Sequence, residues 1–125
     1  MKVRRLCWLG VASEAYEPMV RLFRDVMGMR VAFEEPTTTE LELASGDRVQ
    51  VFARGHRYFA FFDEHARGPV ASFEVDDVRC ARAELLAAGV EVVGEIERDS
   101  DWEWLHVRAP DGNLYELASR RQGDG

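Results

Sequence analysis

Apolar residues occur at every second position in most of the chain and at every third or fourth position in two segments. The first pattern is typical of strands with one buried face, and the second is typical of helices. Gly, Pro and Asp residues interrupt both patterns where turns are expected. The predicted strands are Val3–Ala12, Met29–Glu34, Thr38–Ala44, Arg48–Ala53, Val70–Asp76, Val90–Ile96, Trp102–Ala109 and Leu114–Ala118.

Two helices are predicted between these strands. The first has Pro18 in its first turn and ends before Gly28. The second begins after Asp77, a good N-cap residue, and ends before Gly89. The apolar faces are Met19, Leu22, Phe23, Val26 and Met27 in the first helix, and Val78, Ala81, Leu85 and Ala88 in the second.

The order of one strand, one helix and three strands occurs twice. Gly28 and Gly89 stand at equivalent points of the two copies, and so do Gly46 and Gly112. Because one such unit cannot bury its sheet alone, two copies are expected to pack together. The prediction is an α+β fold of two βαβββ modules that form an open, cleft-bearing sheet. The expected divisions are module one at about 1–54, a connector at about 55–68, module two at about 69–118 and a frayed tail at 119–125.

Strand alternation predicts which side chains face the cleft. The purely aliphatic set of each strand is expected to face the helices, and the mixed aromatic and polar set to face the other way. Aromatic walls with a few directed polar groups are typical of small-molecule sites. Trp102 and Trp104 also suit a core cap or a subunit contact. The predicted lining residues are Trp8, Gln50, Phe52, Ser72, Glu74, Trp102, Trp104, His106 and Glu116.

The last hairpin has a predictable register. Its three-residue loop, Pro110-Asp111-Gly112, ends in the glycine that such loops prefer. Leu105 then pairs with Leu117, which places His106 directly opposite Glu116. This pair has two interpretations: a hydrogen-bonded structural couple, or, with Glu74 or Gln50 nearby, part of a metal site.

Composition excludes several classes of function. The net charge of −7 disfavours a nucleic-acid partner, which needs a basic face. No apolar run approaches the roughly 20 residues that cross a bilayer, so we expect a cytoplasmic protein without a membrane partner. Cys7 and Cys80 have no metal-like or redox-like spacing. The aromatic run Tyr58–Phe62 in the connector predicts packing against a neighbouring surface, either of the same chain or of a partner.

Three motifs resemble the vicinal-oxygen-chelate superfamily, which includes glyoxalase I, bleomycin-resistance proteins and extradiol dioxygenases. They are Leu22-Phe23-Arg24-Asp25-Val26-Met27-Gly28-Met29, Phe73-Glu74-Val75-Asp76-Asp77-Val78 and Pro110-Asp111-Gly112-Asn113-Leu114-Tyr115-Glu116-Leu117. The resemblance implies four metal-ligand positions, which fall on Trp8, Gln50, Val70 and Glu116. Only Glu116 is a residue that the family uses there, so no metal or other cofactor is expected.

The leading hypothesis is a metal-independent binding protein for a small planar, aromatic or cationic organic molecule, similar to the bleomycin-resistance branch. The alternative is a metal-dependent lyase, isomerase or dioxygenase that uses Glu116 and His106; without metal, the same pair would do acid–base work. A third hypothesis is a scaffold or accessory subunit whose main surface is the aromatic connector. The resemblance also implies a homodimer. The sequence leaves open whether the protein is an enzyme.

Overall fold

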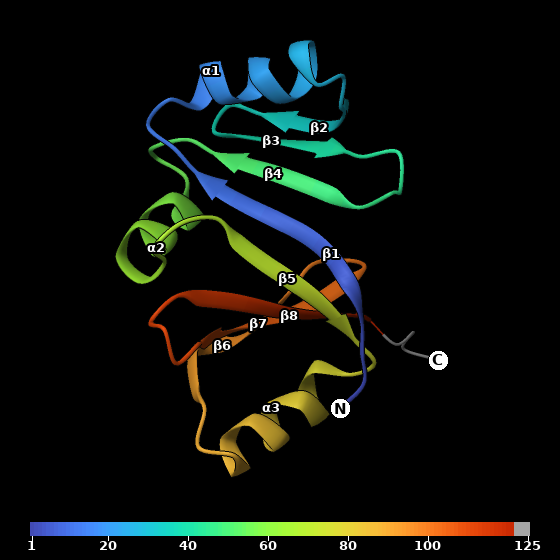
Figure 1. Cartoon of the computed structure of the whole chain (residues 1–125), viewed down its shortest axis with the longest axis vertical. Coiled ribbons are helices and arrows are strands. Elements are labelled where there is room, and N and C mark those ends of the chain that lie inside the picture. The colour runs from blue at the N-terminus through green and yellow to red at the C-terminus, as the bar shows by residue number, and fades with distance from the viewer. Residues whose placement is uncertain (122–125) are drawn as a thin grey trace.

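The structure is a computed structural model and describes residues 1–121. Its centre is an eight-stranded sheet with the order β2-β3-β4-β1-β5-β8-β7-β6 (Figure 1). The predicted α+β fold of two βαβββ modules is confirmed. The strands are β1 (Val3–Ala12), β2 (Arg30–Glu35), β3 (Thr38–Glu42), β4 (Arg48–Phe52), β5 (Val70–Val75), β6 (Glu91–Arg98), β7 (Trp102–Arg108) and β8 (Leu114–Arg120).

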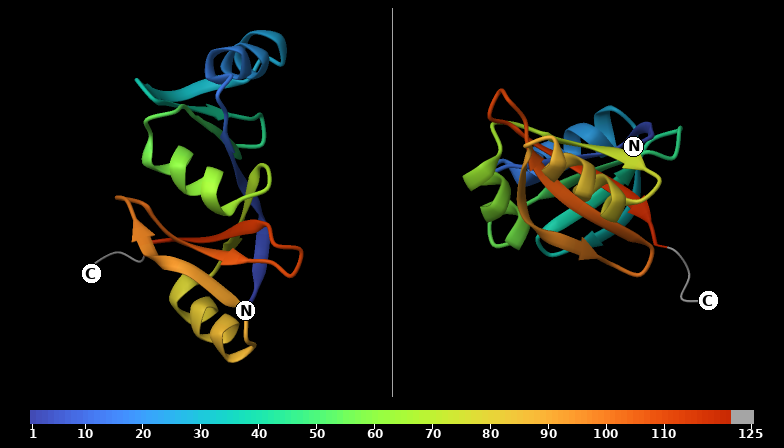
Figure 2. Two further views of the ribbon diagram at one scale, coloured as in Figure 1. Left: turned by 90° about the vertical axis from the view of Figure 1, so that its left-hand side faces the viewer. Right: turned by 90° about the horizontal axis from the view of Figure 1, so that it is seen from below.

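The two modules meet at their first strands, within one chain. β1 and β5 are antiparallel, and Trp8 pairs with Ser72. On either side, β1 pairs with β4 and β5 pairs with β8, both in parallel. The four central strands therefore come from both modules. The outer strands of each module lie at opposite ends of the molecule, and the space between the two halves is partly filled by the connector (Figure 2).

The helices α1 (Tyr16–Arg21) and α3 (Val78–Ala87) lie at opposite ends of the molecule, each against its own module (Figure 1). The side chain of Asp77 caps α3 by accepting a hydrogen bond from the Arg79 amide at 2.8 Å. The aliphatic strand faces pack beneath both helices, as the alternation predicts. The buried residues between α3 and the sheet are Val75, Val78, Ala81, Leu105, Val107 and Leu117, and those between α1 and the sheet are Val20, Leu41 and Val51.

The predicted apolar face of the first helix is partly wrong. The α-helix continues as a π-helical turn over Leu22–Val26, closed by a hydrogen bond from the Met27 amide to the Leu22 carbonyl at 2.9 Å. This wider turn shifts the side chains away from the 3.6-residue period. As a result Leu22, Val26 and Met27 are exposed, and Val20 provides the buried contact.

The connector contains a helix that the sequence pattern did not predict, α2 (Arg57–His65). The His56 ring caps it, because its Nδ1 accepts a hydrogen bond from the Tyr58 amide at 3.0 Å. Phe59 and Phe62 are buried in a cluster with residues of β4, β5 and β8. The aromatic run therefore packs on its own chain, where α2 lies between the two halves (Figure 2).

The last strand is longer than predicted. Ser119 and Arg120, which the sequence assigned to a frayed tail, belong to β8. Ser119 is buried, and its hydroxyl accepts a hydrogen bond from the Val78 amide at 3.1 Å, which ties β8 to the start of α3. The rest of the predicted tail, 122–125, lies outside the described residues. Among residues 1–121, no helix is long and apolar enough to cross a membrane.

Candidate functional site

A cavity of about 750 Å³ lies between the two modules. Its floor is formed by β1, β5 and β8, and its walls by β2, β3 and β4 on one side and β7 on the other. Tyr58 and Phe62 of α2 contribute to the lining. Seven of the nine residues predicted to face the cleft line the cavity: Trp8, Gln50, Phe52, Ser72, Trp102, Trp104 and Glu116.

The floor brings together residues from three neighbouring strands. Ser72 is the pairing partner of Trp8 in β1 and of Glu116 in β8. The Trp8 indole Nε1 donates to the side-chain oxygen of Gln50 at 3.3 Å, and the Gln50 nitrogen donates to the Thr38 hydroxyl at 3.0 Å. Both polar ends of Gln50 are thus engaged, so its amide orients Trp8 rather than standing free for a ligand.

A hydrogen-bonded chain fixes the wall beside α2. Trp104 Nε1 donates to the Tyr58 hydroxyl at 2.9 Å, and that hydroxyl donates to a Glu97 oxygen at 2.5 Å. Burial, followed by the bond to Glu97, raises the pKa of Tyr58, so the phenol stays a donor. The sheet register shifts between Val93 and Glu97, at Gly94. The sequence pattern gave no sign of this irregularity or of Tyr58 as a cavity residue, apart from the aromatic run in which Tyr58 stands.

His106 is opposite Glu116, as predicted, but it does not line the cavity. The side chains of Tyr58, Phe61 and Phe62 surround its ring, which is 1% exposed. Its Nε2 lies 3.1 Å from Glu116 Oε1 but is not aligned for a hydrogen bond, and it has no other partner in the described chain. His106 is therefore not among the residues that line the cavity, because side chains of α2 cover its ring.

Glu74 does not line the cavity either. Its carboxylate accepts a hydrogen bond from Arg5 Nε at 2.7 Å, and Arg5 is the residue that lines the cavity. A register shift in β1 between Leu6 and Trp8 has a second effect, because both Cys7 and Trp8 then face the cavity. Strict alternation had placed Cys7 on the opposite face. Burial raises the pKa of the Cys7 thiol.

The floor does not fit the divalent metal that the resemblance implies. Val70, the expected third position, is buried under α2 in an apolar cluster, and Ser72 stands beside Glu116 instead. The indole nitrogen of Trp8 is a donor only, and Ser and Gln side chains are weak neutral ligands. Within residues 1–121, no group of three His, Cys, Asp or Glu side chains is placed to hold a metal ion.

Glu40 is paired with Gln50 and lies beside Arg48. Burial is the largest influence on its carboxyl and raises the pKa above the ordinary 4.5, although Arg48 acts in the opposite direction. A raised folded-state pKa means that the stability contribution is present below the ordinary value and is lost as pH rises through the raised value. We therefore expect Glu40→Gln to gain stability relative to the parent as pH rises through that window.

Thermal unfolding followed from acidic to neutral pH would check this expectation. Glu95→Gln is the control, because it removes the same charge at an exposed position outside the cavity. If Glu40→Gln were more stable than the parent by the same amount at every pH, the raised pKa assigned to Glu40 would be contradicted.

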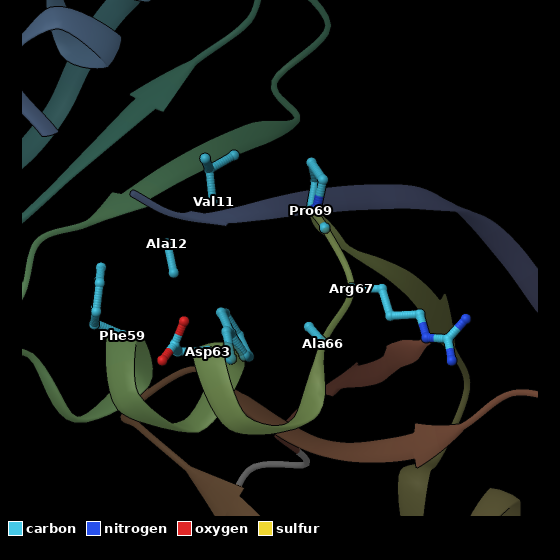
Figure 3. A pocket seen from close by; sticks show the side chains of 9 residues that line it. Val11, Ala12, Phe59, Asp63, Ala66, Arg67 and Pro69 are labelled. Atoms are coloured by element: carbon cyan, nitrogen blue, oxygen red, sulfur yellow. The ribbon is translucent and has the colours of Figure 1, made fainter. Parts of the chain in front are cut away.

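A second, smaller hollow of about 250 Å³ lies between α2 and the end of β1 (Figure 3). Val11 and Ala12 form one side, Phe59 lies on the other, and Asp63 points into the gap while Arg67 extends away from it (Figure 3). Phe62 lines both this hollow and the main cavity, so its ring separates the two.

The sequence model of the Glyoxalase/Bleomycin resistance protein/Dioxygenase superfamily matches residues 5–117. The chain belongs to this superfamily. Membership agrees with the module order and with the central position of Trp8, Ser72 and Glu116 on the floor. No curated protein matches the chain.

Several solved structures share the superfamily fold. A hypothetical protein from Bacillus halodurans C-125 has a TM-score of 0.74 at 13% identity, and the match covers 97% of each chain. Methylmalonyl-CoA epimerase from Streptomyces coelicolor, in complex with 2-nitronate-propionyl-CoA, has a TM-score of 0.71 at 19% identity, covering 97% of this chain and 100% of the other. The Mn(II)-bound glyoxalase from Novosphingobium aromaticivorans has a TM-score of 0.72 at 18% identity, covering 94% of this chain and 39% of the other.

Proposed function

We propose that this member of the superfamily is a metal-independent binding protein whose cavity holds one planar organic molecule. The observation that carries the proposal is the make-up of the floor. At three of the four positions where the superfamily resemblance implies metal ligands, the cavity has Trp8, Gln50 and Glu116, and Ser72 stands beside Glu116 in place of the buried Val70. Flat apolar surface with one directed polar group suits stacking of an aromatic ring.

Binding is favoured over acid–base catalysis by the position of His106. A general base must come within hydrogen-bond reach of the proton that it removes. The His106 ring is enclosed by α2, and Glu116 lies between its Nε2 and the cavity. Of this pair, only Glu116 is therefore placed to exchange a proton with a molecule in the cavity.

A coenzyme A thioester, the kind of ligand bound by the Streptomyces coelicolor epimerase, does not suit this cavity. Its phosphates need free cationic side chains. Of the four lining arginines, Arg5, Arg48 and Arg57 are already paired with carboxylates of the chain, and the Arg120 guanidinium stacks on the Trp102 ring. We therefore propose a ligand without a polyphosphate group.

The scaffold hypothesis loses its main support, because Phe59 and Phe62 of the connector are buried within the chain. The homodimer stays a prediction, and the aromatic connector no longer argues for it.

The proposal predicts a fluorescence response, because all three tryptophans of the chain line the cavity. A stacked ligand is expected to quench or shift their emission in a saturable way, with one site per chain. The test is a titration with planar cations, neutral aromatics and natural-product antibiotics. The response is expected to be the same with an excess of chelator or of Mn²⁺, because no step depends on a metal.

Trp104→Phe keeps an aromatic ring at this wall but removes one emitter and the hydrogen bond to the Tyr58 hydroxyl, so it should reduce both the amplitude of the response and the affinity. Unchanged emission across the whole panel would contradict the binding proposal. A response that the chelator abolishes would contradict metal independence.

A further inference from the structure

The cavity holds several arginines, and each of them already has a partner. Among the described lining residues, three arginines pair with carboxylates, and the guanidinium of Arg120 stacks 4.6 Å from the centroid of the Trp102 ring. The carboxylate pairs are Arg5 with Glu74 and Asp47, Arg48 with Glu40 and Glu42, and Arg57 with Glu97. The charges of three of the four lining arginines are therefore neutralised by carboxylates, and Arg120 keeps its charge on the Trp102 ring.

The cavity also contains acidic side chains that are not neutralised by arginines. Glu35 from module one, and Asp99 and Asp101 from the β6–β7 turn of module two, line the same cavity. Asp99 accepts hydrogen bonds from the amides of Asp101 and Trp102, both at 2.8 Å. Within residues 1–121, none of these three carboxylates has a cationic side chain in ion-pair contact. Both modules thus contribute unpaired acids to the cavity.

The floor adds a fourth acid, and this one is buried. Glu116 is 7% exposed and lines the cavity. Its neighbour His106 Nε2 is 3.1 Å away but misaligned, and Glu116 has no other side-chain partner among the residues described. Burying a carboxylate without a well-formed hydrogen bond costs free energy. A ligand N–H group that donates to such a carboxylate therefore contributes more binding free energy than one that donates to an exposed acid.

From these observations we propose that the ligand is an organic cation: a planar aromatic ring that carries a protonated amine or ring nitrogen. The ring stacks against the tryptophans, and its N–H donates to the Glu116 carboxylate. The unpaired acids of both modules raise the local concentration of cations and lower that of anions. This inference rests on the proposed function, since it gives the charge of the molecule that the cavity binds.

Three probes with the same ring separate charge from shape. They are 9-aminoacridine, which is cationic at neutral pH, acridine, which is neutral, and acridine-9-carboxylate, which is anionic. Affinity is measured by isothermal titration calorimetry at low ionic strength. A charge-assisted hydrogen bond to a buried carboxylate predicts that the cation binds about 10- to 100-fold more tightly than acridine, and the anion more weakly than either.

Glu116→Gln keeps the shape of the side chain and removes its charge. It is expected to reduce about tenfold the cation preference, measured as the ratio of the affinities for 9-aminoacridine and acridine. Glu95→Gln changes the net charge equally but lies on β6 outside the cavity, and it should keep the full preference. Asp101→Asn, at an exposed position, gives an independent check should Glu116→Gln fold poorly, and it should reduce the preference by a smaller factor.

Each outcome has a distinct meaning. Equal affinity for the cation and acridine, or tightest binding of the anion, would overturn the charge inference while leaving the cavity a binding site. Loss of preference in Glu95→Gln as large as in Glu116→Gln would show a general charge effect and would also overturn it. Absence of binding by all three probes, with unchanged tryptophan emission, would count against the proposed function itself.

Discussion

Phe62→Ala is expected to lower the free energy of unfolding by about 3–5 kcal/mol, the usual cost of removing a fully buried Phe ring. Phe62 is 3% exposed and is the ring at the centre of the α2 cluster. Its centroid lies 5.7 Å from that of Phe52, 5.5 Å from that of Tyr58 and 6.3 Å from that of Trp8. These contacts join α2 to both β1 and β4, so the deletion removes the main attachment of the helix.

The substitution also has a local consequence. Because the Phe62 ring separates the main cavity from the hollow beside β1, its loss is expected to connect the two. Water would then reach the buried Nε2 of His106, whose ring centroid is 5.9 Å from that of Phe62. Urea unfolding followed by circular dichroism measures the loss of stability, and hydrogen exchange of the α2 amides measures the loosening of the helix.

Phe33→Ala is the matched control. The same ring is removed, but Phe33 is 38% exposed and makes none of the ring contacts around α2. We expect it to cost less than about 2 kcal/mol. Equal destabilisation by the two substitutions would mean that Phe62 does not hold α2 on the sheet.

Gly10→Ala is expected to displace Trp8 and to abolish binding in the cavity. A Cβ atom at this position would lie 2.2 Å from Cη2 and 2.6 Å from Cζ3 of the Trp8 ring, and 2.9 Å from Cε2 of Phe62. The backbone itself would accept alanine, because Gly10 is not among the glycines with positive φ. The conflict is therefore purely with the ring that rests on the glycine.

Relief of this conflict requires the indole to move, and its hydrogen bond to Gln50 is then lost. Overpacking of this kind costs about 1–3 kcal/mol. The displaced ring is expected to occupy the space of the ligand, so the fluorescence titration should show no saturable response. Near-ultraviolet circular dichroism would report the changed tryptophan environment in the absence of ligand.

Gly68→Ala serves as the comparison, because no atom outside the neighbouring residues lies within 4 Å of the position that an alanine Cβ would take, and the φ of Gly68 is not positive. It is expected to be neutral or slightly stabilising, since alanine restricts the unfolded chain. If the Gly10→Ala protein had the same ligand affinity and the same free energy of unfolding as the Gly68→Ala protein, the position of Trp8 would not be set by contact with Gly10.

The sequence by itself determined the module order and the register of the last hairpin. A side-chain period of two and a three-residue loop leave one pairing in which Leu105 meets Leu117, and His106 then has to face Glu116. The same alternation separated the aliphatic faces that pack under α1 and α3 from the faces that line the cavity. These features follow from local backbone geometry and from which side chains are buried, and the alternation of apolar and polar residues along each strand indicates both.

Only the tertiary structure decided how much of the cavity-facing side of the sheet a ligand can reach. The burial of α2 depends on contacts with residues distant in the chain, such as Phe52 and Leu114, and an aromatic run does not reveal these partners. That helix encloses His106, which alternation alone had placed in the cleft. The register shift in β1 likewise brings Cys7 to a place that a strict period of two excludes, because one extra residue in a strand changes every later side-chain direction.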